Sequence, residues 1–177
     1  GKVIKRRPDL RDQMWIQSKC GIRKDRFTYF DFSKDYILDS VDGILERLQI
    51  ERLDSLLLHR PDALMEPEEV AEAFDELEKS GKVRHFGVSN EDPYTMELLQ
   101  SALHQPICAN QLQMSLTNAT MIAQPMNTNI CDGLNPVLDN GVLNYCRLHN
   151  ITIQTWSPFQ YGFFEGVFIG SEKNPKL

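Results

Sequence analysis

The sequence has little cysteine, no basic tract and no long hydrophobic run. No apolar segment approaches the roughly 20 residues that a membrane-spanning helix needs, and no secretory leader is visible, so we expect no membrane association. The 19 Lys and Arg against 25 Asp and Glu give a net charge of −6, which argues against a nucleic-acid surface. The four cysteines stand far apart without C-x-x-C spacing. This is typical of free thiols in a cytoplasmic protein and predicts no disulfide or metal site.

What remains is the composition of an ordinary globular protein. Hydrophobic residues make up 41% and charged residues 25% of the 177 residues, with 10 Gly and 9 Pro. These values are close to the globular average and exclude a disordered or low-complexity chain. The length corresponds to one domain, which we expect to cover residues 1–177.

Short apolar segments alternate along the chain with longer segments of helical periodicity. The expected strands are residues 14–18, 53–59, 83–89, 108–114 and 152–156. The expected helices begin near Ser33, Pro67, Asp92 and Pro136, and the segment between the first strand and Ser33 is predicted as a loop. No Asn-Gly turn joins neighbouring strands, so the pattern predicts repeated βα units and a parallel sheet.

Such a sheet is either open and doubly wound or closed into a barrel. The open nucleotide-binding form usually carries G-x-G-x-x-G after its first strand, and this sequence has no such motif. The barrel is therefore preferred. A complete barrel takes about 250 residues, so we predict the α/β class and an incomplete (β/α)8 TIM barrel, with about five parallel strands and intervening helices.

Polar side chains stand where these strands end. In chain order they are Lys19, His59, Asn90, Gln111 and Trp156. The carboxyl ends of barrel strands open on one face, where the active sites of such barrels lie. The sequence therefore predicts that these five side chains meet at a common rim.

Four of these five residues also have a structural explanation. Lys19 could be a solvated lysine that ends a strand, and His59 a hydrogen-bonded structural histidine. Asn90 could begin the next helix as its cap, and Trp156 could fill the core. Their shared position at strand ends favours a site.

Five segments at these strand ends together resemble the aldo-keto reductases. They are IQSKCGI (16–22), LLLHRPD (56–62), GKVRHFGVSN (81–90), NQLQMSL (110–116) and TWSPF (155–159). The resemblance implies an NADP(H)-dependent oxidoreductase on a (β/α)8 barrel that binds its cofactor without a Rossmann motif. It would move hydride between the nicotinamide and a small aldehyde or ketone substrate.

The resemblance also implies roles for individual residues. Family members use an Asp, Tyr, Lys and His tetrad, in which Lys19 matches the lysine and His59 the histidine. A lysine ammonium favours a neighbouring phenolate, and a histidine can hydrogen-bond the carbonyl oxygen where negative charge develops. Ser89, Asn90 and Gln111 match the positions that hydrogen-bond the nicotinamide carboxamide.

The remaining cofactor positions implied by the resemblance lie near the end of the chain. Trp156 matches the aromatic position that stacks on the nicotinamide. Ser157, Phe159 and Gly162 fall where the family backbone approaches the pyrophosphate, and a glycine permits close approach there.

Other parts of the family pattern have no match in the sequence. We expect the two strands with the catalytic Asp and Tyr to be missing, because Tyr29, Tyr36 and Tyr94 do not stand in those motifs. The eighth strand and the segment that binds the 2′-phosphate are missing as well. The expectation is therefore a reductase as the parent protein and an inactive isolated chain.

Two other functions stay open. A barrel enzyme could use Lys19 as a Schiff-base nucleophile in a lyase, and a non-catalytic subunit could sense NADP(H). The long segment 117–132 is predicted to border the substrate mouth. The sequence does not indicate an oligomeric state.

Overall fold

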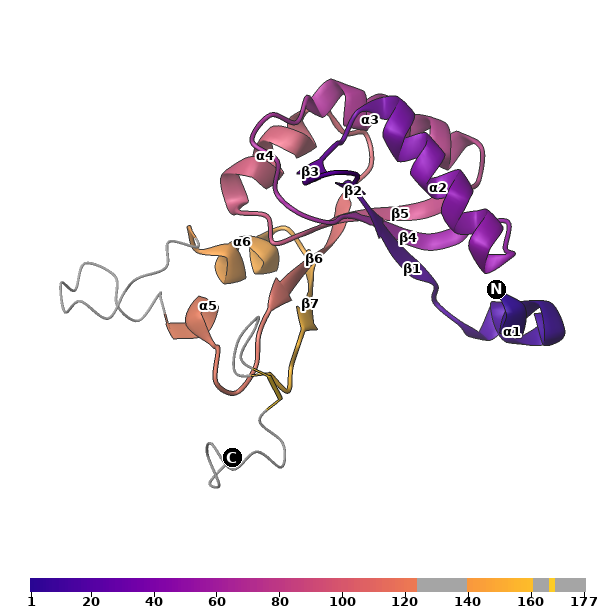
Figure 1. The fold of residues 1–177 in the computed structure, drawn as a ribbon. Coiled ribbons are helices and arrows are strands. Elements are labelled where there is room, and N and C mark those ends of the chain that lie inside the picture. Colours follow the sequence, from indigo (N-terminus) through magenta and orange to yellow (C-terminus); the bar gives the residue numbers. More distant parts are fainter. Residues whose placement is uncertain (124–139, 161–165, 168–177) are drawn as a thin grey trace.

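The structure is a computed structural model that describes residues 1–123, 140–160 and 166–167 (Figure 1). Its strands are β1 (Gln17–Cys20), β2 (Ile22–Lys24), β3 (Thr28–Phe30), β4 (Leu53–Leu58), β5 (Val83–Ser89), β6 (Ile107–Gln113) and β7 (Thr152–Trp156). Its helices are α1 (Lys2–Arg6), the 3₁₀ helix η1 (Pro8–Gln13), α2 (Lys34–Leu48), α3 (Pro67–Lys79), α4 (Pro93–Ala102), α5 (Thr120–Ala123) and α6 (Val142–Leu148). None of these helices is long and apolar enough to cross a membrane.

Five strands form one parallel sheet in the order β1-β4-β5-β6-β7. A parallel sheet with helices between its strands is the predicted architecture, an incomplete (β/α) barrel. The first strand begins later than expected, at Gln17 rather than at residue 14. At Ile16 the amide donates to the Asp54 carboxylate at 2.7 Å, while the carbonyl accepts the backbone amides of Asp54 and Ser55 at 2.9 and 3.3 Å, and the ladder begins with the next residue.

One face of the sheet packs against the helices. Figure 1 shows α2, α3 and α4 on the same side of the sheet. Alternate strand residues point toward them, among them Leu56 and Phe86, which are fully buried. The Phe86 ring stacks on Phe74 of α3 with 4.1 Å between ring centres. This outer face holds the apolar core.

The opposite, inner face is much more polar. It carries the side chains between those core positions, because successive residues of a strand point to opposite faces. Gly87 lies on this face, where a Cβ atom would come within 2.6 Å of both the Ala109 carbonyl oxygen and the Leu57 side chain. The close approach of β5, β4 and β6 therefore requires glycine at this position.

The segment predicted as a loop before Ser33 contains a β-hairpin. Strands β2 and β3 pair antiparallel, with Ile22 opposite Phe30. The Asp25 amide donates to the Phe27 carbonyl at 3.0 Å and closes the turn. This correction to the sequence prediction concerns two strands of three residues, too short for a periodicity signal and joined without an Asn-Gly turn.

The later helices differ in how they begin. Asp92 caps α4, because its carboxylate accepts the Tyr94 and Thr95 amides at 2.9 and 3.4 Å. Helix α6 begins after Asn140 and Gly141, whose φ angles of 53° and 75° lie in the left-handed region. The Asn-Gly pair therefore precedes this helix. Its predicted start near Pro136 lies outside the described residues, as do residues 124–132 of the long predicted loop.

Candidate active site

Side chains from four strand ends meet in one pocket of about 140 Å³. It is lined by Lys19, His59, Arg60, Ser89, Asn90 and Trp156. These residues belong to β1, the turn after β4, the end of β5 and the end of β7. The volume is below the roughly 300–1,000 Å³ of a complete ligand site, so the pocket has the size for one end of a ligand.

Lys19 is half-buried, and its ammonium is turned toward the inner face of the sheet. Its Nζ donates to Gln111 Oε1 at 2.6 Å, which joins the first strand of the sheet to β6. Burial lowers the pKa of Lys19, and the Arg60 guanidinium lowers it further. The short bond to an amide oxygen acts in the opposite direction, because it favours the charged ammonium.

His59 follows the last residue of β4 and is held by its backbone. Its amide donates to the Cys20 carbonyl at 2.9 Å, which continues the pairing of β4 with β1 past the end of the ladder. Burial lowers the pKa of His59, with smaller contributions from Lys19 and Arg60. This shift favours the neutral imidazole, which can donate one N–H to a ligand oxygen.

Asn90 and Trp156 form the opposite wall of the pocket. Asn90 has a φ of 61°, in the left-handed region, and its amide donates to the Gln111 carbonyl at 3.0 Å. The Trp156 indole Nε1 donates to Asn90 Oδ1 at 3.0 Å. This bond fixes which way the Asn90 amide faces, since an indole N–H can only donate. Because Asp92 caps α4, Asn90 is not the helix cap.

The other predicted cofactor residues have mixed positions. Ser89 lines the pocket but is only 2% exposed, and its hydroxyl donates to the Gln111 carbonyl at 3.1 Å. Ser157 follows β7 with a φ of 53°. Phe159 is 56% exposed, and Gly162 lies outside the described residues. Cofactor binding by these four residues, as by Asn90, Gln111 and Trp156, stays a prediction.

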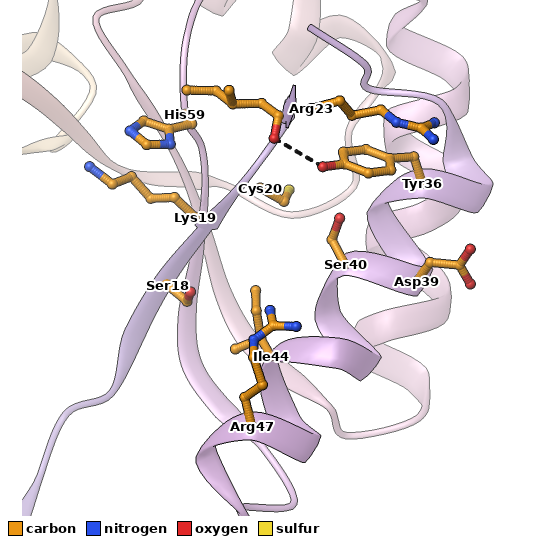
Figure 2. Close-up of a pocket in the computed structure, with 11 residues that line it drawn as sticks. Ser18, Lys19, Cys20, Arg23, Tyr36, Asp39, Ser40, Ile44, Arg47 and His59 are labelled. Carbon is orange, nitrogen blue, oxygen red and sulfur yellow. Dashed lines mark hydrogen bonds between the residues drawn. The ribbon is translucent and has the colours of Figure 1, made fainter. Parts of the chain in front are cut away.

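A second pocket of about 510 Å³ lies between β1 and α2 (Figure 2). Lys19 and His59 line it as well, so the two pockets share this pair. The Tyr36 hydroxyl donates to the Ile22 carbonyl at 3.1 Å, and Figure 2 shows it directed toward β1, with the Lys19 ammonium pointing to the far side of that strand. The Arg23 guanidinium lies 4.8 Å from the centre of the Tyr36 ring. Tyr36 is thus a packing residue and does not face the smaller pocket.

The structure adds two residues that the sequence did not indicate. Arg60 lines the smaller pocket, with its guanidinium 6.0 Å from the centre of the Trp156 ring. Its position directly after His59 could have indicated that it lies near the pocket. Gln154 accepts a hydrogen bond from Gln111 Nε2 at 3.2 Å on the inner face, and the alternation of Thr152, Gln154 and Trp156 along β7 was its signal. Within the described ranges, no group of three or more His, Cys, Asp or Glu side chains could hold a metal ion.

Comparisons with known proteins agree with this architecture. The chain is 37% identical over 169 residues to "Uncharacterized oxidoreductase YcsN" of Bacillus subtilis, which covers 92% of this chain and 51% of that protein. It is 34% identical over 179 residues to "6-dehydroglucose reductase" of Agrobacterium fabrum, covering 97% and 55% respectively. The solved fold of aldo-keto reductase AKR11C1 from Bacillus halodurans (holo form) matches with a TM-score of 0.65 and 23% identity, over 86% of this chain and 44% of that one.

The chain therefore spans about half the length of these curated relatives. The model of the "Aldo/keto reductase family" matches residues 1–175, which is nearly the whole sequence. Sequence match, parallel sheet and the residues at the strand ends agree, and the chain belongs to the aldo/keto reductase family.

Proposed function

We propose that the natural protein is a nicotinamide-dependent oxidoreductase that reduces an aldehyde or ketone, with NADP(H) as cofactor. One observation carries this proposal: Lys19, His59, Asn90 and Trp156, from four separate strand ends, line a single pocket. An ammonium and an imidazole can stabilise negative charge on a carbonyl oxygen, and an amide and an indole can hold a nicotinamide ring.

The residues of this pocket fit a nicotinamide. The indole of Trp156 provides a flat apolar surface for the ring. Because Asn90 Oδ1 accepts the indole N–H, its Nδ2 group is left facing away from the indole, suited to donate to a carboxamide oxygen. The cofactor, when bound, supplies the hydride.

The charged and polar residues would stabilise the reacting oxygen. A neutral His59 would donate its N–H to the substrate carbonyl oxygen, where negative charge develops during reduction. The Lys19 ammonium adds positive charge on the same side of the pocket and would favour a neighbouring phenolate. No tyrosine lines this pocket in the described part of the chain, so the proton donor is not assigned to Tyr29, Tyr36 or Tyr94.

The substrate that we propose is a small polar carbonyl compound. Five of the six residues that line the pocket carry a polar or charged group, and these groups could hydrogen-bond the hydroxyls of a polar substrate. One relative is named 6-dehydroglucose reductase, after a sugar with a carbonyl group. This name supports the same class of substrate.

The test compares two histidine variants of the natural full-length protein. We expect His59→Gln to lower kcat/KM for NADPH-dependent reduction of sugar-type carbonyls by about 10²- to 10³-fold, the range measured for loss of an oxyanion donor. His104 is exposed and bonds to Asp75, and His104→Gln should retain full activity. NADH in place of NADPH tests the cofactor preference. Quenching of nicotinamide fluorescence without any turnover would overturn the enzyme proposal and indicate a cofactor-sensing subunit.

One observation favours a second candidate, a Schiff-base lyase. Burial and Arg60 lower the pKa of Lys19, and both effects are known to activate lysine nucleophiles. Borohydride reduction in the presence of a carbonyl substrate, without nucleotide, would trap an adduct on Lys19 if this chemistry occurs. The reductase proposal predicts no adduct on Lys19 above the level found on the exposed Lys24.

A further inference from the structure

Three glutamine side chains meet on the inner face of the sheet, and we call Gln17, Gln111 and Gln154 the amide cluster. Gln17 Nε2 donates to Gln154 Oε1 at 2.7 Å, and Gln154 Nε2 donates back to Gln17 Oε1 at 3.0 Å. Gln111 Nε2 donates to the same Gln154 oxygen at 3.2 Å. Since β1 and β7 are the two edge strands of the five-stranded sheet, this cluster joins the edges across its concave side.

One end of the amide cluster is fixed by a group that can only donate. The Trp15 indole Nε1 donates to Ser55 Oγ at 3.1 Å. Ser55 in turn donates its own proton to Gln17 Oε1 at 2.8 Å. In this arrangement Gln17 presents its oxygen to Ser55 and an N–H to Gln154, and the Gln154 oxygen also accepts an N–H from Gln111.

The other end of the amide cluster is also fixed by a group that can only donate, the Lys19 ammonium. The Lys19 ammonium has three N–H donors and no acceptor, and it donates to Gln111 Oε1 at 2.6 Å. A flipped Gln111 amide would set an NH₂ group against the ammonium and a carbonyl against the Gln154 oxygen. Both contacts would be repulsive, so each amide of the cluster has one orientation that satisfies its neighbours.

We propose that Gln17 and Gln154 are positioning residues for Lys19, which act by holding the Gln111 oxygen toward its ammonium. The cluster would fix where the ammonium stands beside His59 and would keep it protonated in a partly buried pocket. The catalytic use of Lys19 rests on the proposed function, whereas its position and protonation do not. Neither Gln17 nor Gln154 lines the smaller pocket, so both act through Gln111.

The pKa of Lys19 in the natural full-length protein tests this directly, by NMR titration of lysine labelled with ¹³C at Cε. Gln154→Met keeps the side-chain length and removes the acceptor for Gln111. We expect it to lower the pKa of Lys19 by up to about one pH unit, because Gln111 is then no longer held with its oxygen toward the ammonium, and that oxygen stabilises the charged form.

Gln105→Met is the matched control, because Gln105 is 5% exposed and bonds to Asp75 and Glu78 at the outer surface, away from Lys19. It should lower the thermal stability without moving the pKa of Lys19. The variants keep the other charged or histidine side chains that line the two pockets with Lys19: Arg23, Asp39, Arg47, His59 and Arg60.

The two possible failures are distinguishable. An unchanged pKa of Lys19 in Gln154→Met, or an equal decrease in Gln105→Met, would overturn the positioning role whatever the activity. If the pKa of Lys19 moves as expected while the protein has no reductase activity, the proposed function fails and the positioning of Lys19 stands. With both correct, Gln154→Met lowers kcat more than it raises KM for the cofactor, and its pH profile shifts with the pKa of Lys19.

Discussion

Glu91 is a buried carboxyl group, and its replacement should change how the free energy of unfolding depends on pH. It follows Asn90 of the pocket directly and is 2% exposed. Its Oε2 atom has no hydrogen-bond partner among the described residues. Burial, together with the nearby Asp92 and Asp62 carboxylates, raises the pKa of Glu91 to about 7. The perturbation is Glu91→Gln, which keeps the shape and removes the charge.

The sign of the effect follows from proton binding. Between pH 4.5 and 7 the folded state binds the Glu91 proton and the unfolded state does not, so stability falls as the pH rises through this range. The contribution is fully present below pH 4.5 and lost above pH 7. A pKa of about 7 against the ordinary 4.5 corresponds, at 1.36 kcal/mol per pH unit, to about 3 kcal/mol.

Urea unfolding followed by circular dichroism between pH 4.5 and 8 measures this quantity. We expect the free energy of unfolding of the original protein to fall by about 3 kcal/mol more than that of Glu91→Gln over this interval. Glu68 is exposed on α3, and Glu68→Gln should follow the original pH dependence. If Glu91→Gln and the original protein change in parallel within about 0.5 kcal/mol, the reasoning about this buried carboxyl is refuted.

Three further substitutions test the packing around the site. Leu56→Ala should lower the free energy of unfolding by about 2–5 kcal/mol in urea, since Leu56 is fully buried in the outer core, and a loss below 1 kcal/mol would contradict that packing. Gly87→Ala should lower the melting temperature sharply because a Cβ would lie 2.6 Å from Ala109 and Leu57 atoms; an unchanged value would show that β5 can move. Asp92→Ala should cost about 0.5–2 kcal/mol through loss of the α4 cap, while Asp92→Asn should retain most of the stability.

The parallel sheet was predictable because its strands are apolar and its helices are periodic. The segment 83–89 was predicted as a strand and forms β5, and the segment 152–156 forms β7. Strand β4 (Leu53–Leu58) has four leucines in six residues and is buried along its whole length, which is typical of a strand covered on both faces. The common rim could be predicted from the topology alone, because parallel strands end at one edge of the sheet. The structure brings the predicted residues Lys19, His59 and Trp156 together in one pocket.

Other features depend on contacts that a sequence does not display. The hairpin of β2 and β3 has strands of three residues, too short for a pattern of alternation. The orientation of the Gln111 amide is set by side chains on three other strands. Arg60 lies in the turn after β4, and the conformation of that turn brings its side chain to the pocket. The periodicity of apolar residues does not predict the conformation of a turn.

The register of β1 connects the chemistry of the site to the stability of the fold. Lys19 pairs with Leu57 and points to the inner face, while its neighbour Cys20 is 5% exposed and belongs to the outer core. A slip of one residue would exchange them, because strand side chains alternate between faces. The Lys19 ammonium would then lie among the apolar side chains next to α2, at a cost of several kcal/mol for an unpaired buried charge. The same ammonium that is proposed to favour a phenolate in the site therefore also excludes the wrong register. Lys19→Met, which removes that penalty, should weaken the specificity of pairing between β1 and β4.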